Sequence, residues 1–373
     1  MKIKDVKNAG ELYSFLDQGA EKIGWTVRLK AGRYMLDYDR NLKFHRDMSF
    51  IGEPGEPGKV VIDTSAMSGN NLKTDDGNRT GAIRMGNGYN SIEGVTIENH
   101  TDNGLRSLIQ TDINLTPIAE VKVANCVLSG ASIGLVIGNL NEANFRILKA
   151  HVYENEIFDN TIDKFQAGIF IQNRSNVNGI IDVLMERNSV YRNGTGLWTF
   201  NSATNGNISV ISKGDKFYLN GIGISMMGGL NSPMGADDKD KSTYNKTVFQ
   251  ADGSAIFHNG GIDLGPEFNK VKGGVFATAG FVSGSGISDS VNSNSLDIVF
   301  KRSIIDQNRP YNDLLDYNVY RAFEDQSNRV GEHNSISLDI SDPDNIIGQH
   351  RGDGRGAVDP RILNPDHSIA LPS

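Results

Sequence analysis

Several charged and aromatic residues that could take part in catalysis or binding stand two to four positions after a glycine, in short apolar segments. Arg84 and Arg106 are cations that can neutralise a carboxylate and make the neighbouring C–H bond acidic, and Asp263 offers a carboxylate for proton transfer. We predict that these three residues are catalytic. Side chains that can stack on a substrate or contact it share the same spacing, and we predict that they bind it: Phe170, Gln172, Trp198, Phe200 and Met227.

These residues share one face if the runs are β-strands. Side chains alternate along a strand, so when the residue after glycine points inward the next one points outward. The inward positions are then mostly apolar, as a core requires: Leu135, Ile137, Ile169, Ile171, Leu197, Thr199, Ile224, Met226, Ile262 and Leu264. The outward positions form a strip with cations at one end and a carboxylate at the other: Arg84, Arg106, Val136, Phe170, Trp198, Ser225 and Asp263.

The outward aromatic rings need an explanation, because a solvated strand face is normally polar. They can stack on sugar rings, or line a pocket for an apolar small molecule. They can also be covered as a second core by the inserted loop 228–246 or by the tail 311–373. A register shift of one residue would place them inside and remove the site.

A repeat must position the strip. Seven six-residue windows align without gaps: 94–99, 125–130, 155–160, 188–193, 215–220, 254–259 and 303–308. Their third positions, from Thr96 and Val127 to Ile305, suggest one core column, and all but one window end in Asn, the exception being Gly130. One such unit cannot bury its apolar face alone, which predicts stacked coils. An Asn at one corner of each coil would form an asparagine ladder, and Asn or Gly there tolerates a left-handed backbone.

Composition narrows the classes of protein. The chain has 373 residues with 42 Gly and 10 Pro, which fits many tight turns between short strands. A net charge of −8 argues against a nucleic-acid partner, and no apolar run approaches the ~18 residues of a membrane span. The single cysteine, Cys126, is interpreted as a buried structural thiol. The first residues lack a signal-peptide core, which predicts a cytoplasmic protein, or a secreted one if the N-terminus has been trimmed.

The repeat resembles the right-handed parallel β-helix of the pectate-lyase-like superfamily over residues 24–310. Within 27–63, "AGRY" resembles the usual "pGtY" of that superfamily and "FIGE" its "iiGe". The resemblance implies an all-β fold with a single-stranded right-handed parallel β-helix over 1–310. A cap helix is expected at 11–23, where Leu12, Phe15, Leu16 and Ile23 form a stripe after a capping-box pair, Asn8 and Glu11. Residues 311–373 are expected to be an irregular tail packed on the solenoid.

The same resemblance implies a carbohydrate-active enzyme, because the outward face of this strand is commonly the polysaccharide groove of the superfamily. A lyase of an acidic polysaccharide would use Arg84 and Arg106 on the sugar carboxylate, with His100, His151 or an arginine as the base. A hydrolase would use two carboxylates, Asp263 and Glu267. The superfamily's hydrolase clusters, its lyase calcium cluster and the Asp-Pro-His-Glu motif of alginate epimerases are absent from the sequence. We expect no cofactor and no metal, although the polar turn at 352–359 offers acids for calcium.

Two other functions stay open. The first is a cytoplasmic isomerase or cyclase of a small molecule, favoured by the missing polysaccharide motifs and the apolar middle of the strip; a closed apolar pocket would support it. The second is a non-catalytic binding or spike-like solenoid, which predicts an oligomer with the strip buried between chains. The sequence leaves the oligomeric state undecided.

Overall fold

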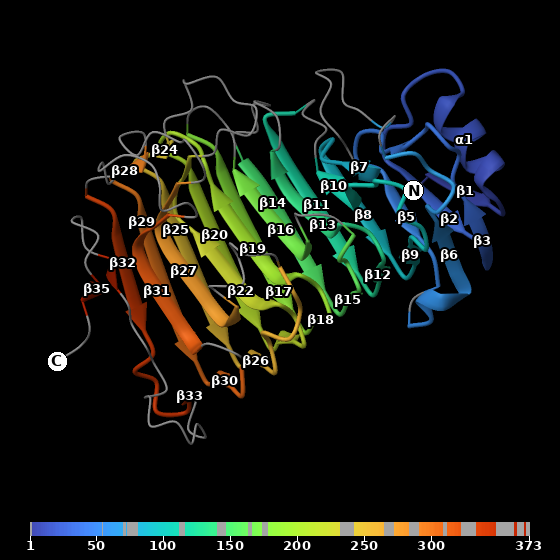
Figure 1. The fold of residues 1–373 in the computed structure, drawn as a ribbon. Helices are drawn as coiled ribbons and strands as arrows, with labels where there is room; N and C mark the ends of the chain where they lie inside the picture. Colours follow the sequence, from blue (N-terminus) through green and yellow to red (C-terminus); the bar gives the residue numbers. More distant parts are fainter. Residues whose placement is uncertain are drawn as a thin grey trace.

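A computed structural model shows the chain as a solenoid in which almost every coil adds one strand to each of three sheets (Figure 1). It describes residues 2–53, 55–69, 72, 81–111, 116–139, 147–162, 166–173, 178–231, 242–264, 272–282, 291–308, 312–321, 333–347, 362–363 and 369–370.

Three sheets, A, B and C, contain most of the strands, and the order of strands in sheets A and B follows the chain. Sheet A consists of β1 (Lys2–Val6), β2 (Trp25–Leu29), β5 (Ser49–Ile51), β8 (Tyr89–Glu93), β11 (Ile118–Ala124), β14 (Ile147–Tyr153), β17 (Ile180–Glu186), β20 (Asn207–Lys213), β25 (Lys246–Asp252), β29 (Ser295–Lys301) and β32 (Ser335–Asp339). Sheet B consists of β3 (Gly32–Met35), β6 (Val60–Asp63), β9 (Thr96–Glu98), β12 (Val127–Ser129), β15 (Glu156–Phe158), β18 (Ser189–Tyr191), β21 (Lys216–Tyr218), β26 (Ala255–Phe257), β30 (Ile304–Asp306) and β33 (Ile346–Ile347).

Sheet C consists of β4 (Leu42–Lys43), β7 (Gly81–Met85), β10 (Ser107–Thr111), β13 (Ile133–Asn139), β16 (Ala167–Asn173), β19 (Thr195–Asn201), β22 (Ile222–Met227), β23 (Leu230–Asn231), β27 (Gly273–Val282) and β31 (Asn312–Arg321). Outside these sheets lie the parallel pair β24 (Ser242–Thr243) and β28 (Val291–Asn292), the antiparallel pair β34 (Ile362–Leu363) and β35 (Ile369–Ala370), helix α1 (Ala9–Asp17) and the 3₁₀ turn η1 (Pro57–Lys59).

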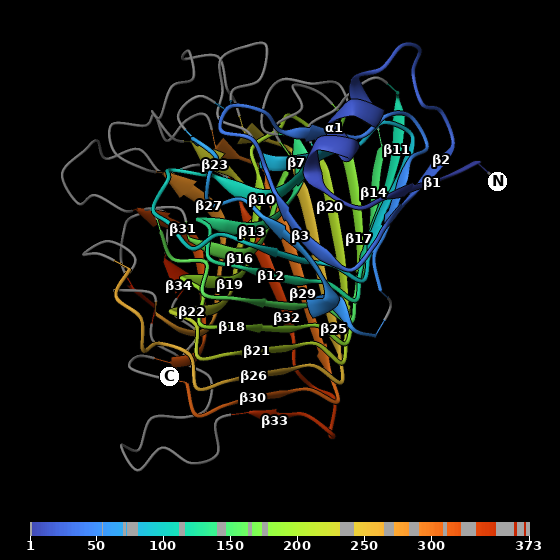
Figure 2. The same cartoon turned by 90° about the vertical axis from the view of Figure 1, so that its right-hand side faces the viewer.

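The strand pairs between successive coils are parallel, for example β13 with β16 and β16 with β19. Figure 2 separates the sheets: the sheet A strands β11, β14 and β17 run on one side, away from the sheet C strands β10, β13 and β16. The chain is thus a right-handed parallel β-helix, which confirms the predicted fold class.

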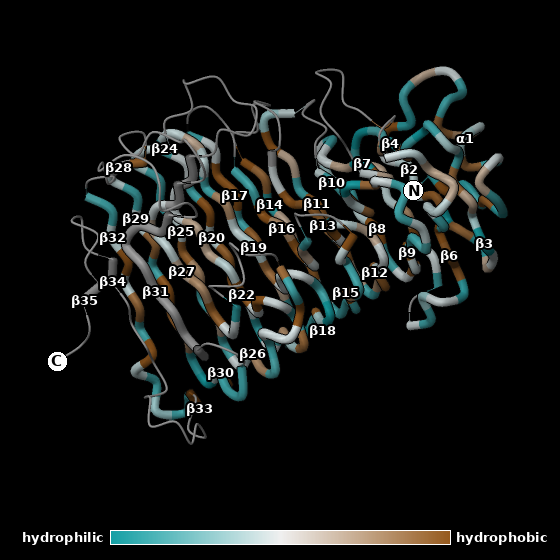
Figure 3. Tube along the Cα trace, viewed as in Figure 1, coloured by the Kyte–Doolittle hydropathy of each residue, from teal (hydrophilic) through white to brown (hydrophobic). Residues whose placement is uncertain are grey.

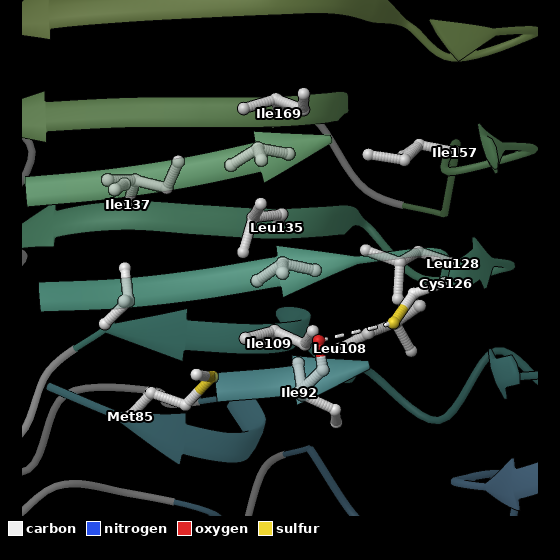
Figure 4. Packing of buried hydrophobic residues seen from close by; sticks show 14 of the residues in the cluster. Met85, Ile92, Leu108, Ile109, Cys126, Leu128, Leu135, Ile137, Ile157 and Ile169 are labelled. Atoms are coloured by element: carbon white, nitrogen blue, oxygen red, sulfur yellow. Dashed lines mark hydrogen bonds between the residues drawn. The ribbon is translucent and has the colours of Figure 1, made fainter. Parts of the chain in front are cut away.

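The interior of the solenoid is a stack of aliphatic side chains. In sheet C one column runs through register neighbours that are all at most 2% exposed: Ile83, Ile109, Leu135, Ile169, Leu197, Ile224 and Val275. Figure 4 shows Ile109, Leu135 and Ile169 of this column one above another, and the colouring of Figure 3 shows hydrophobic and hydrophilic residues interspersed along the strands. Each fully buried side chain of this size contributes roughly 1.5–3 kcal/mol. Cys126 belongs to this core, with its thiol near the Ile92 carbonyl (Figure 4).

The repeat windows correspond to sheet B, but the first two are displaced by one residue. Leu128 pairs with Ile97 and with Ile157, so the core column passes through Ile97 and Leu128 rather than Thr96 and Val127. Gly130, with φ +84°, then takes the place of Asp159, with φ +56°. An alignment anchored on the terminal Asn or Gly cannot detect this shift, because either residue suits a corner.

From Asn160 onward, each corner between sheets B and C combines a left-handed residue with a buried polar one. The left-handed residue comes first, as at Asp159, Arg192 and Leu219, and the buried Asn follows it. The expectation that the buried Asn itself is left-handed was therefore wrong. Its amide serves hydrogen bonds instead: at the corner between sheets B and C the backbone and side-chain N–H groups of each Asn donate to Oδ1 of the next, at 2.8–3.2 Å.

Helix α1 covers the N-terminal end of the solenoid (Figure 1). Asn8 caps it by accepting the Glu11 N–H at 2.9 Å, and Glu11 Oε2 accepts the N–H of Lys7, one residue before the cap. The helix ends at Asp17, earlier than expected, since Gln18 is extended and Gly19 has φ +69°. Ile23 is 45% exposed and takes no part in the packed stripe.

The coil continues beyond residue 310, where an irregular tail was expected. Strands β31, β32 and β33 pair in parallel with β27, β29 and β30. The described part of the solenoid therefore reaches Ile347. The polar turn at 352–359 lies outside the described residues.

Candidate functional site

The predicted strip exists as a register column on the outer side of sheet C. The column runs Lys43, Arg84, Gln110, Val136, Phe170, Trp198, Ser225 and Phe276. A second outer column contains Gln172, Phe200 and Met227. Six of the eight predicted site residues therefore lie in these two columns.

Most of this face is buried, so it is not an open groove. Trp198 is 3% exposed, Phe200 is 5% exposed and Met227 is fully buried. The rings of Phe170, Trp198 and Phe200 pack together with centroids 5.1–5.7 Å apart. A polymer cannot reach these side chains in this conformation, which favours the second-core explanation for the aromatic middle.

Arg106 and Asp263 do not belong to the strip. Ser107, not Gly104, pairs with Gly81, so Gln110 occupies the position expected for Arg106. The strand that follows Ser225 in the column is β27, where Phe276 is the register neighbour. Asp263 lies before that strand in an exposed, non-strand segment, and Glu267 lies outside the described residues. The prediction took Gly261 as the start of the strand, but β27 begins only at Gly273.

A cavity of about 630 Å³ lies where the strip reaches helix α1. Its lining residues include three cationic ones (Arg40, Lys43 and Arg84), three acidic ones (Asp17, Glu21 and Asp39), and Tyr13 and His45. Arg84 was predicted from the sequence, whereas Lys43 and His45 were missed. β4 is only two residues long and no glycine precedes it, so the only signal was the alternation of buried Leu42 and Phe44 with Lys43 and His45.

Two cations of this cavity face outward side by side. Lys43 and Arg84 are register partners on adjacent parallel strands, and the Phe44 N–H donates to the Arg84 carbonyl at 3.0 Å just beyond them. Lys43 makes no ion pair with any residue that the structure describes. A carboxylate between the two side chains would accept a charge-assisted hydrogen bond from each.

On another part of the cavity lining, Arg40 and Tyr13 are fixed by ion pairs and hydrogen bonds. Arg40 pairs with Asp17 and, at 3.3 Å, with Asp37, and its guanidinium lies 4.3 Å from the centre of the Tyr13 ring. Burial raises the pKa of Tyr13 to about 12, and its hydroxyl donates to the Arg40 carbonyl at 2.8 Å. Tyr13 therefore stays protonated near neutral pH. It connects α1 to the 37–40 segment.

His45 joins the cavity to the cap helix. Its Nε2 lies 2.9 Å from the carbonyl oxygen of Leu16, in the last turn of α1, and its own carbonyl accepts the Asn90 side-chain amide at 3.0 Å. Glu21 Oε1 accepts from the Asn87 side chain and from the Arg46 N–H at 3.2 and 3.3 Å. These contacts fix one wall of the cavity.

The other candidates are occupied in surface or core roles. His151 contacts Glu186 at 2.8 Å on the outer side of sheet A, and His100 contacts Glu98 at 2.9 Å. Cys126 is 1% exposed and burial raises its pKa to about 12, which confirms a structural thiol. Within the described ranges, no cluster of three His, Cys, Asp or Glu side chains is arranged to hold a metal ion. Nor is any described helix long and apolar enough to span a membrane.

Comparison with known proteins yields matches to solved structures alone. No protein-family model and no curated sequence matches the chain. Pectin methylesterase PemA from Erwinia chrysanthemi is 10% identical with a TM-score of 0.39, covering 89% of this chain and 93% of its own. The A-module of the mannuronan C-5 epimerase AlgE6 from Azotobacter vinelandii is 12% identical with a TM-score of 0.30, covering 91% and 92%. The PL6 alginate lyase AlyGC is 11% identical with a TM-score of 0.30, covering 94% and 54%. At these scores the similarities carry no argument about activity.

Proposed function

We propose that the chain is a carbohydrate-active protein, a lyase of an acidic polysaccharide, that holds a sugar carboxylate between Lys43 and Arg84. The observation that carries this proposal is the register pairing of the two cations on the wall of the 630 Å³ cavity. A uronate carboxylate is planar and accepts two charge-assisted hydrogen bonds, which suits a lysine beside an arginine.

The same contact supplies part of the chemistry. Neutralising the carboxylate stabilises the negative charge that develops when the adjacent C5–H bond breaks, so the cations favour the transition state of elimination. A two-carboxylate hydrolase has less support, because Asp263 lies away from the strip. The substrate would enter at the α1 end, and not along the buried aromatic column.

Isothermal titration with oligogalacturonate and with oligomannuronate tests this proposal, with an uncharged cello-oligosaccharide as the control ligand. Lys43→Ala and Arg84→Ala should each weaken acidic-oligosaccharide binding at least tenfold, since a charge-assisted hydrogen bond is worth about 1.5–3 kcal/mol. Binding should also weaken as salt is raised.

Lys149→Ala is the matched control variant, because it removes an exposed cation from sheet A, outside the cavity. It should leave binding unchanged. Failure of the unaltered protein to bind either acidic ligand, or equal affinity in all three variants, would refute the proposal.

A further inference from the structure

We infer that His45 is the catalytic base that takes the C5 proton of a uronate held by Lys43 and Arg84. This inference rests on the proposed function and adds to it the residue that performs the proton transfer. Neither the repeat nor the glycine spacing marks His45.

The first step is the position of the ring proton. The Leu16 carbonyl oxygen can only accept a hydrogen bond, so the Nε2 atom 2.9 Å away must donate and carries the hydrogen. A neutral imidazole has one ring hydrogen. Nδ1 therefore keeps its lone pair and is the basic atom.

The second step is the side of the chain on which His45 lies. Leu42 and Phe44 are buried, Lys43 is exposed and His45 is half-buried, so Lys43 and His45 lie on the same side of an extended segment. Two residues of a strand span about 7 Å between Cα atoms. A carboxylate at the Lys43 side chain thus brings its adjacent carbon toward His45.

The third step is the rigidity of the arrangement. Leu16 packs into the core at 8% exposure, and Asn90, fully buried, holds the His45 carbonyl while its Oδ1 accepts the N–H groups of Gly86 and Asn87. A base held on both sides needs little reorganisation when the substrate arrives.

The competing groups in the cavity are less suited to the task. Tyr13 holds its proton up to a pKa of about 12, and one oxygen of Glu21 already accepts two hydrogen bonds. Asp17 is paired with Arg40. Among the described lining residues, His45 combines a donor nitrogen bonded to the Leu16 carbonyl with a second ring nitrogen that can accept a proton.

The reaction balances without a co-reactant. Nδ1 takes the C5 proton, the C–H electron pair forms the C4=C5 double bond, and the bond from C4 to the glycosidic oxygen breaks. The leaving oxygen takes a proton from the imidazolium or from water. The products are a new reducing end and an unsaturated uronate, whose ultraviolet absorbance reports turnover.

His45→Gln tests the inference in the full chain, because the glutamine amide can still donate to the Leu16 carbonyl but cannot act as a base. We expect turnover to fall at least 100-fold, with oligouronate affinity within twofold of the unaltered protein and an unchanged melting temperature. In the unaltered protein kcat/KM should rise with pH through a single ionisation, because a general base acts only in its unprotonated form. The residual activity of His45→Gln should not show this rise of kcat/KM with pH.

Two measurements distinguish a catalytic base from a residue that only stabilises the fold through its bond to Leu16. Long-range ¹H–¹⁵N spectra of the ligand-free protein should show the hydrogen on Nε2; a hydrogen on Nδ1 overturns the inference. His45→Ala should lose stability as well as turnover, and if His45→Gln restores both, His45 only stabilises the fold.

The failure of the inference is distinguishable from the failure of the proposed function. If the unaltered protein binds oligouronate through Lys43 and Arg84 but either produces no unsaturated sugar or is unaffected by His45→Gln, the inference is wrong and the binding site stands. If the unaltered protein binds no oligouronate, both fall.

Discussion

The corner between sheets B and C and the corner between sheets A and B share a left-handed turn but differ in their buried side chains. The first contains asparagine in five successive coils: Asn160, Asn193, Asn220, Asn259 and Asn308. The second contains a mixed series: Asn155, Asn188, Asp215, Ser254 and Ser303. An amide both donates and accepts, so its chain of bonds can pass through any number of coils, whereas a carboxylate only accepts.

At Asp215 the series at the corner between sheets A and B changes from an amide to a carboxylate side chain. Its Oδ1 accepts the backbone N–H and the side-chain amide of Asn188, each at 2.8 Å, and its Oδ2 accepts the Ser212 hydroxyl at 2.6 Å. The side chain is fully buried, and this burial raises its pKa to about 6. The mixed corner therefore holds an ionisable group that the asparagine corner lacks.

Breaking the asparagine corner should have the largest effect on stability. In Asn193→Ala, the N–H and side-chain amide of Asn160 lose their acceptor, and the Ile157 carbonyl loses its donor. Each buried orphan costs about 1–3 kcal/mol, so we expect a loss of about 3–5 kcal/mol in urea denaturation followed by circular dichroism. Asn207→Ala, an exposed asparagine on β20, is the control and should change stability by less than about 0.5 kcal/mol.

Converting the mixed corner toward the uniform one should have the next largest effect. A folded-state pKa of about 6, above the ordinary aspartate value of 3.8, means that Asp215 favours the folded state most in its protonated form. The stabilisation that protonated Asp215 gives to the folded state is complete below pH ~4 and is lost as the pH rises through about 6. Asp215→Asn should thus gain about 2–3 kcal/mol over the unaltered protein at pH 8 and nothing at pH 3.5.

Denaturation midpoints of the two proteins between pH 3.5 and 8 measure that difference. A constant offset at every pH would contradict the assignment of the ionisable group, because a purely steric change has no pH dependence.

Substitutions at the left-handed backbone positions of the two corners should have the smallest effect on stability. The mixed corner has Gly253 at the left-handed position, with φ +65° and no atom within 4 Å of an added Cβ, whereas the uniform corner has Gln307 there, with φ +57°. Gln307→Gly should stabilise by about 0.5–1 kcal/mol, and Gly253→Ala should destabilise by about 1 kcal/mol. Thermal melts of both variants check the pair; effects of equal sign would show that side-chain contacts outweigh the backbone term.

The sequence predicted those features that each coil repeats. The windows ending in Asn160, Asn193 and Asn220 located sheet B, because a buried amide at a corner recurs with every coil. The inward column was correct from Leu135 to Ile224, since the alternation of a strand leaves no second choice once a glycine marks its start. Arg106 and Asp263 were misplaced where loop length changed between coils.

The candidate site was harder to predict because it depends on contacts between distant segments. Nothing near Trp198 in the sequence shows that its outward side is buried. Likewise, the importance of Lys43 and His45 depends on Arg84 in the next sheet C strand and on Leu16 in the cap helix. Of these residues Arg84 alone was predicted, although Gly81 stands three residues before it and Gly168 only two before Phe170.

The corner amides also bear on how such a chain can lengthen. Asn193 gives its two N–H groups to Asn220 and receives two from Asn160, and each of its neighbours does the same one coil away. A duplicated segment of 33 residues, the spacing from Asn160 to Asn193, would find the same donor and acceptor on either side. Gene duplication within this stretch can thus extend the molecule without new chemistry, while the cavity under α1 belongs to one end and would remain a single site.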